Sequence, residues 1–173
     1  MRLTRFITLV AIATVLVLLP GAVDATSTMA AAISPTTVLI HPGIVKVSRA
    51  EAGPPTTAFC EKTYHIACYQ PGQIQQAYDL APLFNQGITG TGQTIIIVDS
   101  FGSPTIARDL KTFDDTFDLP APPSLTVIQP AGPVAPYKPN PTREGWAGET
   151  TLDVEYAHTM APGANILLVE TPS

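Results

Sequence analysis

The chain has 173 residues, with 9 Lys and Arg against 14 Asp and Glu, so its formal net charge is −5. Such an acidic chain is a poor candidate for nucleic-acid binding, which depends on basic residues that neutralise phosphates. Beyond residues 7–19, no segment is long and apolar enough to span a bilayer.

Residues 1–25 have the pattern of a secretory signal peptide. Arg2 and Arg5 form a positive start, residues 7–19 form an apolar core, and the sequence VDA at 23–25 fits a cleavage site. The core is shorter than the roughly 20 residues of a spanning helix, which argues against the alternative of an uncleaved anchor. Cleavage would change the net charge to −6, because two basic residues and one acidic residue are lost. We therefore expect a secreted, extracellular protein that leaves the membrane after cleavage.

Residues 26–57 are rich in Thr, Ala, Pro and Ser, and predict a flexible leader. The only two cysteines, Cys60 and Cys68, follow it. In an exported chain such a pair predicts a disulfide, and closing so short a loop stabilises the fold by about 2–3 kcal/mol. The alternative is a zinc site formed by the two cysteines and His65. Such a site has only three protein ligands, whereas structural zinc takes four.

Residues 73–84 predict a short helix that packs Ile74, Ala77 and Tyr78, and Pro82 either interrupts it or starts a second turn. A turn-rich approach to the first core strand follows, marked by Gly87, Gly90 and Gly92.

The β-branched run at residues 94–98 predicts a buried strand over 93–99. Asp99 ends it, where open α/β sheets place their sites, and is a candidate residue of the substrate cleft. Next come a predicted helix at 105–117, a second strand at 125–129 and an exposed proline-rich loop at 131–143.

The stretch from Gly145 to Ser173 predicts a helix, a sharp stop and a buried strand. The periodic run begins after Gly148. Its packing stripe is formed by Leu152, Tyr156 and Met160. The helix is then stopped by Pro162 and Gly163. The apolar run 165–169 predicts a central strand beside 93–98, covered on both faces. This α/β alternation predicts a parallel sheet with right-handed crossovers, although three strands are too few for a complete domain.

Glu149 and Asp153 are four residues apart, so their side chains share one face of this helix. Two carboxyls held close together share a proton and raise one pKa, which can produce a general base. The alternative is structural: acidic residues are common in first helical turns because the helix dipole favours them. Trp146, just before the pair, either walls a substrate cleft or packs against the helix start.

Two blocks resemble serine-carboxyl peptidases of the sedolisin family. GETTLDVEYAHTMAPGANILLVE resembles the segment with the catalytic Glu and Asp, and CYQPGQIQQAYDLAPLFNQGITGTGQTIIIVDSFGSP resembles the start of the mature domain. The resemblance covers residues 68–173. It implies that 58–173 form the amino-terminal part of a subtilisin-like, three-layer α/β/α domain with a mostly parallel sheet. It also implies a monomeric, acid-active endopeptidase for peptide or protein substrates, in which Glu149 takes the proton of a serine nucleophile and Asp153 orients Glu149.

Asp99 followed by serine also resembles the start of a subtilisin. Subtilisins carry a histidine near the start of the next catalytic helix, whereas His158 lies near the helix end, so the base is assigned to Glu149. We expect His158 to interact favourably with the carboxyl end of the helix dipole.

The chain departs from the family pattern downstream. The family's nucleophile lies in a Gly-Thr-Ser motif, and none of Ser100, Ser103 and Ser124 has that context. The oxyanion Asp and the calcium site of the family also lack counterparts, so calcium is expected only in a complete domain and no metal or other cofactor in this chain. By itself the chain is expected to be inactive. The alternative is a secreted, inactive remnant that binds peptides or a partner.

Overall fold

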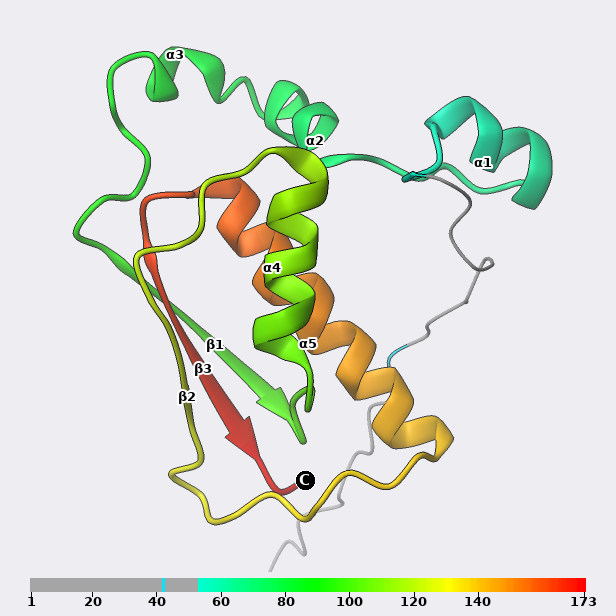
Figure 1. The fold of residues 1–173 in the computed structure, drawn as a ribbon, viewed down its shortest axis with the longest axis vertical. Helices are drawn as coiled ribbons and strands as arrows, with labels where there is room; N and C mark the ends of the chain where they lie inside the picture. Colours follow the sequence, from blue (N-terminus) through cyan, green and yellow to red (C-terminus); the bar gives the residue numbers. More distant parts are fainter. Residues whose placement is uncertain (1–41, 43–52) are drawn as a thin grey trace, which may run out of the picture. The chain divides into compact units, whose positions relative to one another are not determined.

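The computed structural model describes residue 42 and residues 53–173, so the predicted signal peptide and most of the predicted leader lie outside the described residues. Helices and strands alternate from β1 onward, which places the described part in the α/β class (Figure 1). In chain order the elements are α1 (Thr57–Tyr64), α2 (Pro71–Ala77), α3 (Ala81–Phe84), β1 (Thr94–Ser100), α4 (Ile106–Phe117), β2 (Leu125–Ile128), α5 (Pro141–Met160) and β3 (Asn165–Thr171).

The three strands form one parallel sheet in the order β1-β3-β2. β3 is central and pairs with β1 from Thr94↔Asn165 to Ser100↔Thr171. The predicted place of 165–169, in the middle of the sheet and beside the first strand, is confirmed.

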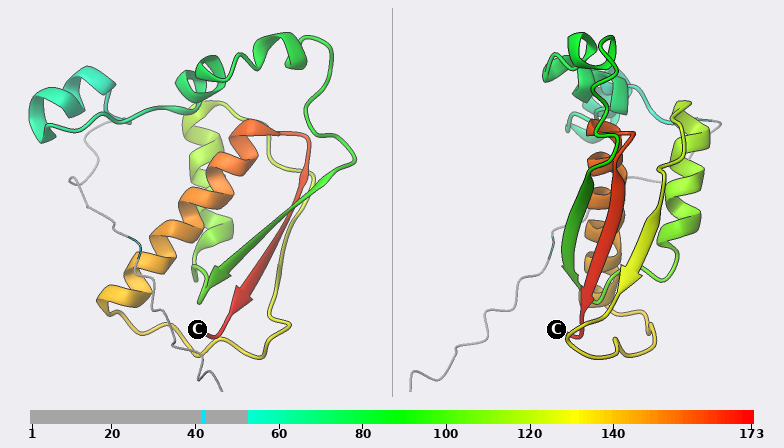
Figure 2. Two further views of the ribbon diagram at one scale, coloured as in Figure 1. Left: turned by 180° about the vertical axis from the view of Figure 1, so that it is seen from behind. Right: turned by 90° about the vertical axis from the view of Figure 1, so that its left-hand side faces the viewer.

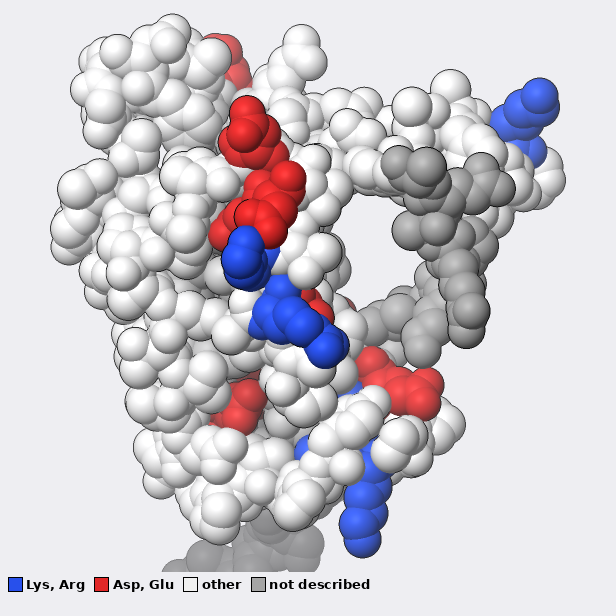
Figure 3. All heavy atoms as spheres, in the orientation of Figure 1, with Lys and Arg blue, Asp and Glu red and all other residues white. Residues whose placement is uncertain are grey.

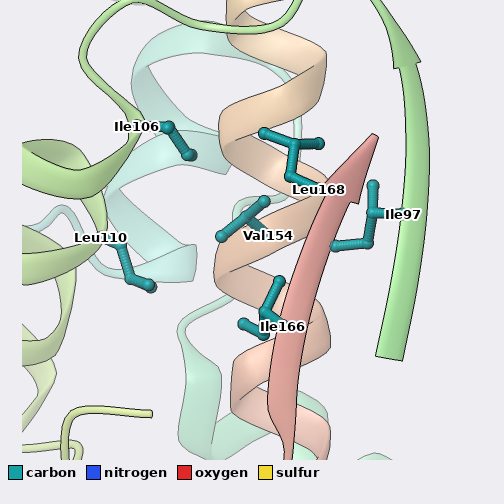
Figure 4. Close-up of a cluster of buried hydrophobic side chains, with 6 residues drawn as sticks. All are labelled: Ile97, Ile106, Leu110, Val154, Ile166 and Leu168. Atoms are coloured by element: carbon teal, nitrogen blue, oxygen red, sulfur yellow. The ribbon is translucent and has the colours of Figure 1, made fainter. Parts of the chain in front are cut away.

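The core lies between this sheet and the two long helices, which cover the same face of it (Figure 2). The side chains converge from α4, α5, β1 and β3 (Figure 4). Fully burying one such side chain stabilises a fold by roughly 1.5–3 kcal/mol, so this cluster is the main source of stability. Its buried members are Ile97, Ile106, Leu110, Val154, Ile166 and Leu168.

The prediction of right-handed crossovers is only half correct. The chain passes from β1 through α4 to the far strand β2, and then returns through α5 to the middle position. Because both helices lie on one face, the two connections have opposite hands: the α4 crossover is right-handed and the α5 crossover is left-handed (Figure 2). A left-handed crossover is a rare exception, and here it carries α5 back behind β1 and β3.

The other face of the sheet is bare among the described residues. Ile96 and Val98 of β1 are 62% and 63% exposed, and Ile128 of β2 is 39% exposed. The expectation that the last strand is covered on both faces is therefore not met within this part of the chain. Parallel sheets are normally covered on both faces, and within the described residues this sheet has that cover on one face only.

The helix α5 begins earlier than predicted. Asn140 caps it by accepting a hydrogen bond from Arg143 N at 3.0 Å, and Pro141 occupies the first turn, where its missing N–H is harmless. The predicted loop at 131–143 therefore ends at residue 140. A proline-rich sequence predicts a loop, but Pro141 stands in the first turn, where proline starts a helix.

The predicted packing stripe of α5 is wrong at Leu152, whereas Tyr156 and Met160 are half-buried. Leu152 is 49% exposed, and of the predicted residues Tyr156 makes the clearest contact, with its ring centroid 5.9 Å from that of Phe113. The buried positions are instead small or polar, a pattern in which apolar periodicity is weak. They are Gly145, Thr150, Val154, His158 and Thr159.

The segment before the sheet has one predicted covalent bond and one unexpected helix. Cys60 and Cys68 form the disulfide, which excludes the zinc alternative, since a disulfide sulfur is no thiolate ligand. α1 was not predicted: it begins after Thr56, whose side chain accepts a hydrogen bond from Phe59 N. The helix expected at 73–84 is two helices, α2 and α3, and Tyr78 between them is 68% exposed rather than packed.

Across the described ranges, none of the helices has the length and apolarity to span a membrane.

Two Leu→Ala substitutions test this account of the core. Leu168, which is fully buried in β3, should cost about 2–5 kcal/mol of unfolding free energy when truncated. Leu152, half exposed on α5, should change it by about 0.5 kcal/mol or less. Urea denaturation followed by circular dichroism measures both. Equal losses for the two variants would show that the core does not lie where the structure puts it.

Candidate functional site: a carboxyl cluster at the edge of the sheet

The candidate site lies at the carboxyl end of the parallel strands. Asp99, at the end of β1, is 5% exposed and stands in register with Glu170 of β3, which is 7% exposed. Glu149 and Asp153 of α5 approach Asp99 from the helix side. Their charges, with that of Glu170, act on the Asp99 carboxyl. Sites of open α/β sheets form at this edge because the chain leaves the sheet there.

Asp99 and Asp153 form the central pair. The Asp99 side chain lies within hydrogen-bonding reach of Asp153. Because two carboxylates offer no donor, a bond between them requires a proton on one of the two. Burial is the main cause that raises the pKa of Asp99 to about 6, with smaller contributions from the charges of Asp153, Glu149 and Glu170. Burial also raises the pKa of Asp153, against the lowering effect of Asp99. The pair can therefore hold or release a proton in mildly acidic solution.

Asp99 lies in a different position from the one that the sequence predicts. The sequence predicts that it lines a cleft, but its side chain is buried and lies close to Asp153. Glu149 is half-buried one turn before Asp153, and its charge helps to raise the pKa of Asp99. The sharing of a proton between Glu149 and Asp153 stays a prediction, and the structure adds Asp99 as a second carboxyl close to Asp153.

Two buried polar atoms at the site have unused bonding capacity. Thr150 faces Asp99 and lowers its pKa, yet no bond of normal geometry joins them, and both Asp99 Oδ2 and Thr150 Oγ1 are buried without a partner. A proton on Asp99 or a small movement of either side chain would satisfy both. Within the described part of the chain, no three His, Cys, Asp or Glu side chains are arranged to hold a metal ion.

Trp146 lies on the same side of α5 as the acidic residues. It precedes Glu149 by three residues and Asp153 by seven, which places all three on one helical face, and it is half-buried. Its role as a cleft wall stays a prediction.

An aromatic contact holds the loops near the site together. The Arg143 guanidinium lies 4.7 Å from the ring centroid of Phe101, just after β1, and 5.7 Å from that of Tyr137. It also donates from Nη2 to the carbonyl of Ala135 at 2.9 Å. Phe101 has a positive φ of 63°, which is rare for an aromatic residue. The start of α5 is thus attached to the loop that follows Asp99.

His158 lies in the last turn of α5, as predicted, and also has contacts that the sequence did not predict. It is fully buried, and its Nε2 donates to the carbonyl of Pro120 at 2.7 Å and lies 3.4 Å from Asp114 Oδ1. Burial raises the pKa of Asp114, while His158 opposes the rise. The histidine therefore joins α5 to α4 and its following loop, because its position near a helix end also faces the neighbouring helix.

The sequence interpretation missed the environment of Glu155. Burial raises its pKa to about 7, and the charges of Asp109 and Asp114 add to the rise. Glu155 belongs to a hollow of about 390 Å³ that also includes Asp109 and Tyr137. It is two residues from Asp153 and so points from another side of α5. Only the packing of α4 against α5 reveals this environment.

The outer surface of α4 carries charges of both signs (Figure 3). Lys111 Nζ lies 2.6 Å from Asp115 Oδ2, and Arg108 Nε lies 3.6 Å from Asp109 Oδ1. On the face drawn, this mixture offers no continuous basic surface of the kind that binds nucleic acid.

Comparisons with known proteins do not identify a relative: no family model, no curated protein and no solved structure matches the chain.

The buried carboxyls predict an unusual dependence of stability on pH. Folded Asp99 keeps its proton up to a pH of about 6, whereas the unfolded side chain loses it near 3.8. The folded state therefore binds more protons in between, and the free energy of unfolding should fall as the pH rises from about 4 to about 7.5. For Asp99 alone the fall is at most about 3 kcal/mol, and Asp153, Asp114 and Glu155 act in the same direction.

Urea denaturation at both pH values measures this effect. Asp99→Asn should reduce the difference between them, because an amide does not titrate. Asp118→Asn, at an exposed position with a positive φ that Asn tolerates, is the control and should leave the difference unchanged. A pH dependence that is the same in Asp99→Asn and wild type would contradict the assignment.

Proposed function

We propose that this chain is the amino-terminal part of a secreted serine-carboxyl endopeptidase of the sedolisin class. The observation that carries the proposal is the meeting of Asp153 with buried Asp99, beside Glu149, at the carboxyl edge of a parallel sheet. These are residues of the two sequence blocks that resemble the family. Neighbouring carboxyls, of which Asp99 keeps its proton up to a pH of about 6, are suited to acid–base catalysis at acid pH.

In the proposed reaction, a serine hydroxyl attacks the carbonyl carbon of the scissile peptide bond. Glu149 takes the hydroxyl proton as the new C–O bond forms, and then gives it to the amine nitrogen as the C–N bond breaks. Water releases the acyl group by the same two proton transfers. Asp153 orients Glu149, and Asp99 supports Asp153 from the sheet side. An acid pH suits such a base, since a histidine would already be protonated there.

The nucleophile must come from residues other than these 173, since none of the serines has the Gly-Thr-Ser context. The bare face of the sheet supports the need for more protein: a subtilisin-like domain would cover Ile96, Val98 and Ile128 with further helices. The chain by itself is therefore proposed to be inactive.

Secretion is part of the same proposal. The disulfide between Cys60 and Cys68 is the kind of bond that persists in oxidising compartments, and the signal-peptide pattern of residues 1–25 is consistent with that location.

The test is to read the gene beyond the codon for Ser173, express the protein extended to any downstream Gly-Thr-Ser motif and measure peptide hydrolysis at acid pH. Glu149→Ala should lower kcat by about 10²–10⁴ or more, because the base is lost. Asp153→Asn should also lower it strongly, since an amide cannot share the proton.

Glu155→Gln is the matched control, because it removes an acid from the same helix but from a different side. It should leave turnover nearly unchanged, with circular dichroism confirming that all variants fold. If Glu155→Gln abolishes hydrolysis and Glu149→Ala does not, the base is wrongly assigned. A gene that stops after Ser173 and yields a folded, inactive protein would favour the binding remnant instead.

A further inference from the structure

Glu170 is a buried carboxyl that the proposed reaction does not use. It is the sixth residue of β3, in register with Asp99 of β1, and its side chain lies on the helix-covered face, as those of Ile166 and Leu168 do. At 7% exposure it is almost completely removed from water. A carboxyl is seldom buried unless its oxygens have partners, so its contacts indicate its role.

The two oxygens of Glu170 contact two different loops. Oε2 accepts a hydrogen bond from Nε2 of Gln129, just after β2, at 2.8 Å. Oε1 lies against Gly102, just after β1, where an added Cβ would overlap it. Gly102 also has a positive φ of 65°, so glycine is favoured there for two reasons: its backbone conformation and the space that Glu170 occupies.

The two contacts of Glu170 are with the loops that follow β1 and β2, at the edge of the sheet where the acid pair lies. Gly102 is three residues after Asp99, and the turn between them is closed by Phe101 N, which donates to the carbonyl of Thr171 at 2.8 Å. Gln129 also accepts a bond from Val134 N at 3.0 Å, which attaches the loop before α5 to the same edge. Glu170 is therefore the point at which the loops after β1 and β2 are both attached to the central strand.

We infer that Glu170 is a positioning residue, which holds the turn after β1 so that the Asp99 carboxyl stays against Asp153. The inference rests on the proposed function for its catalytic meaning, while the positioning itself can be measured without hydrolysis. The charged groups that face Asp99 are Glu149 and Asp153 from α5 and Glu170 from β3. A residue that only filled space at this edge would affect the packing but not the titration of its neighbours.

Carbon-13 NMR titration of the Asp99 and Asp153 carboxyls in the 173-residue chain separates these roles. Glu170→Gln keeps the shape and a hydrogen-bond acceptor but removes the charge. The pKa of Asp99 should fall, because Glu170 raises it in the wild type, and the two aspartates should still titrate as a coupled pair. Glu170→Ala removes both contacts, so the two should titrate more independently, and the Phe101 amide should exchange with solvent faster.

Gly102→Ala tests the contact from the other side. It should disturb the two titrations as Glu170→Ala does, and it should do less additional harm when combined with Glu170→Ala, which leaves room for the new methyl group. If Glu170→Ala does not fold, Gln129→Ala replaces it, because that residue is exposed. Its loss removes the bond to Oε2 and the bond from Val134 N, and leaves the contact of Oε1 with Gly102 in place.

Wild-type titration of both aspartates in Glu170→Ala, or in Gln129→Ala where it replaces that variant, would overturn the inference. So would a Glu170→Gln variant in which the pKa of Asp99 does not change. Failure of the proposed function would look different: the extended protein would hydrolyse no peptide, while the effect of Glu170 on the acid pair would persist.

Discussion

The parallel pairing of β1 with β3 is the constraint on which the rest of the structure depends. It sets Asp99 beside Glu170 and aligns Ile97 with Leu168, so the same register makes both the site and the core. α5 then packs behind this pair of strands through Val154, one residue beyond Asp153. Because strand and helix are fixed by apolar packing, the carboxyls at their ends are held close together despite their mutual repulsion.

The left-handed crossover through α5 determines which residues of α5 reach the site. A right-handed return from β2 would have placed α5 on the opposite face, with Glu149 and Asp153 away from the buried side chain of Asp99. The rare left-handed crossover therefore places Asp153 beside Asp99, which is the contact that distinguishes this acid pair. The stability needed for this arrangement comes from the apolar cluster, and the buried acids reduce it above their raised pKa values.

The polar groups inside the helix layer form two separate sets. Asp99, Asp153 and Glu149 lie at the edge of the sheet, whereas Asp114, His158 and Glu155 lie between the helices. Only the first set is near the carboxyl ends of the strands, where a substrate could approach. In the second set, His158 of α5 lies 3.4 Å from Asp114 of α4 and bonds to the loop after it, while Glu155 lines a hollow beside α4. A strongly raised pKa in this protein therefore does not by itself indicate a catalytic residue.

The sequence by itself determined the local features: three core strands, the α4 helix, the disulfide and the closeness of Glu149 to Asp153 on one helical face, each of which depends on residues near one another in the chain. The tertiary structure alone decided the hand of the α5 crossover, the buried face of α5 and the carboxyl that lies beside Asp153. Asp99 precedes Asp153 by 54 residues, and no local pattern states which carboxyl meets which. That choice was made by long-range packing, which buries Thr150 and His158 and leaves Leu152 exposed.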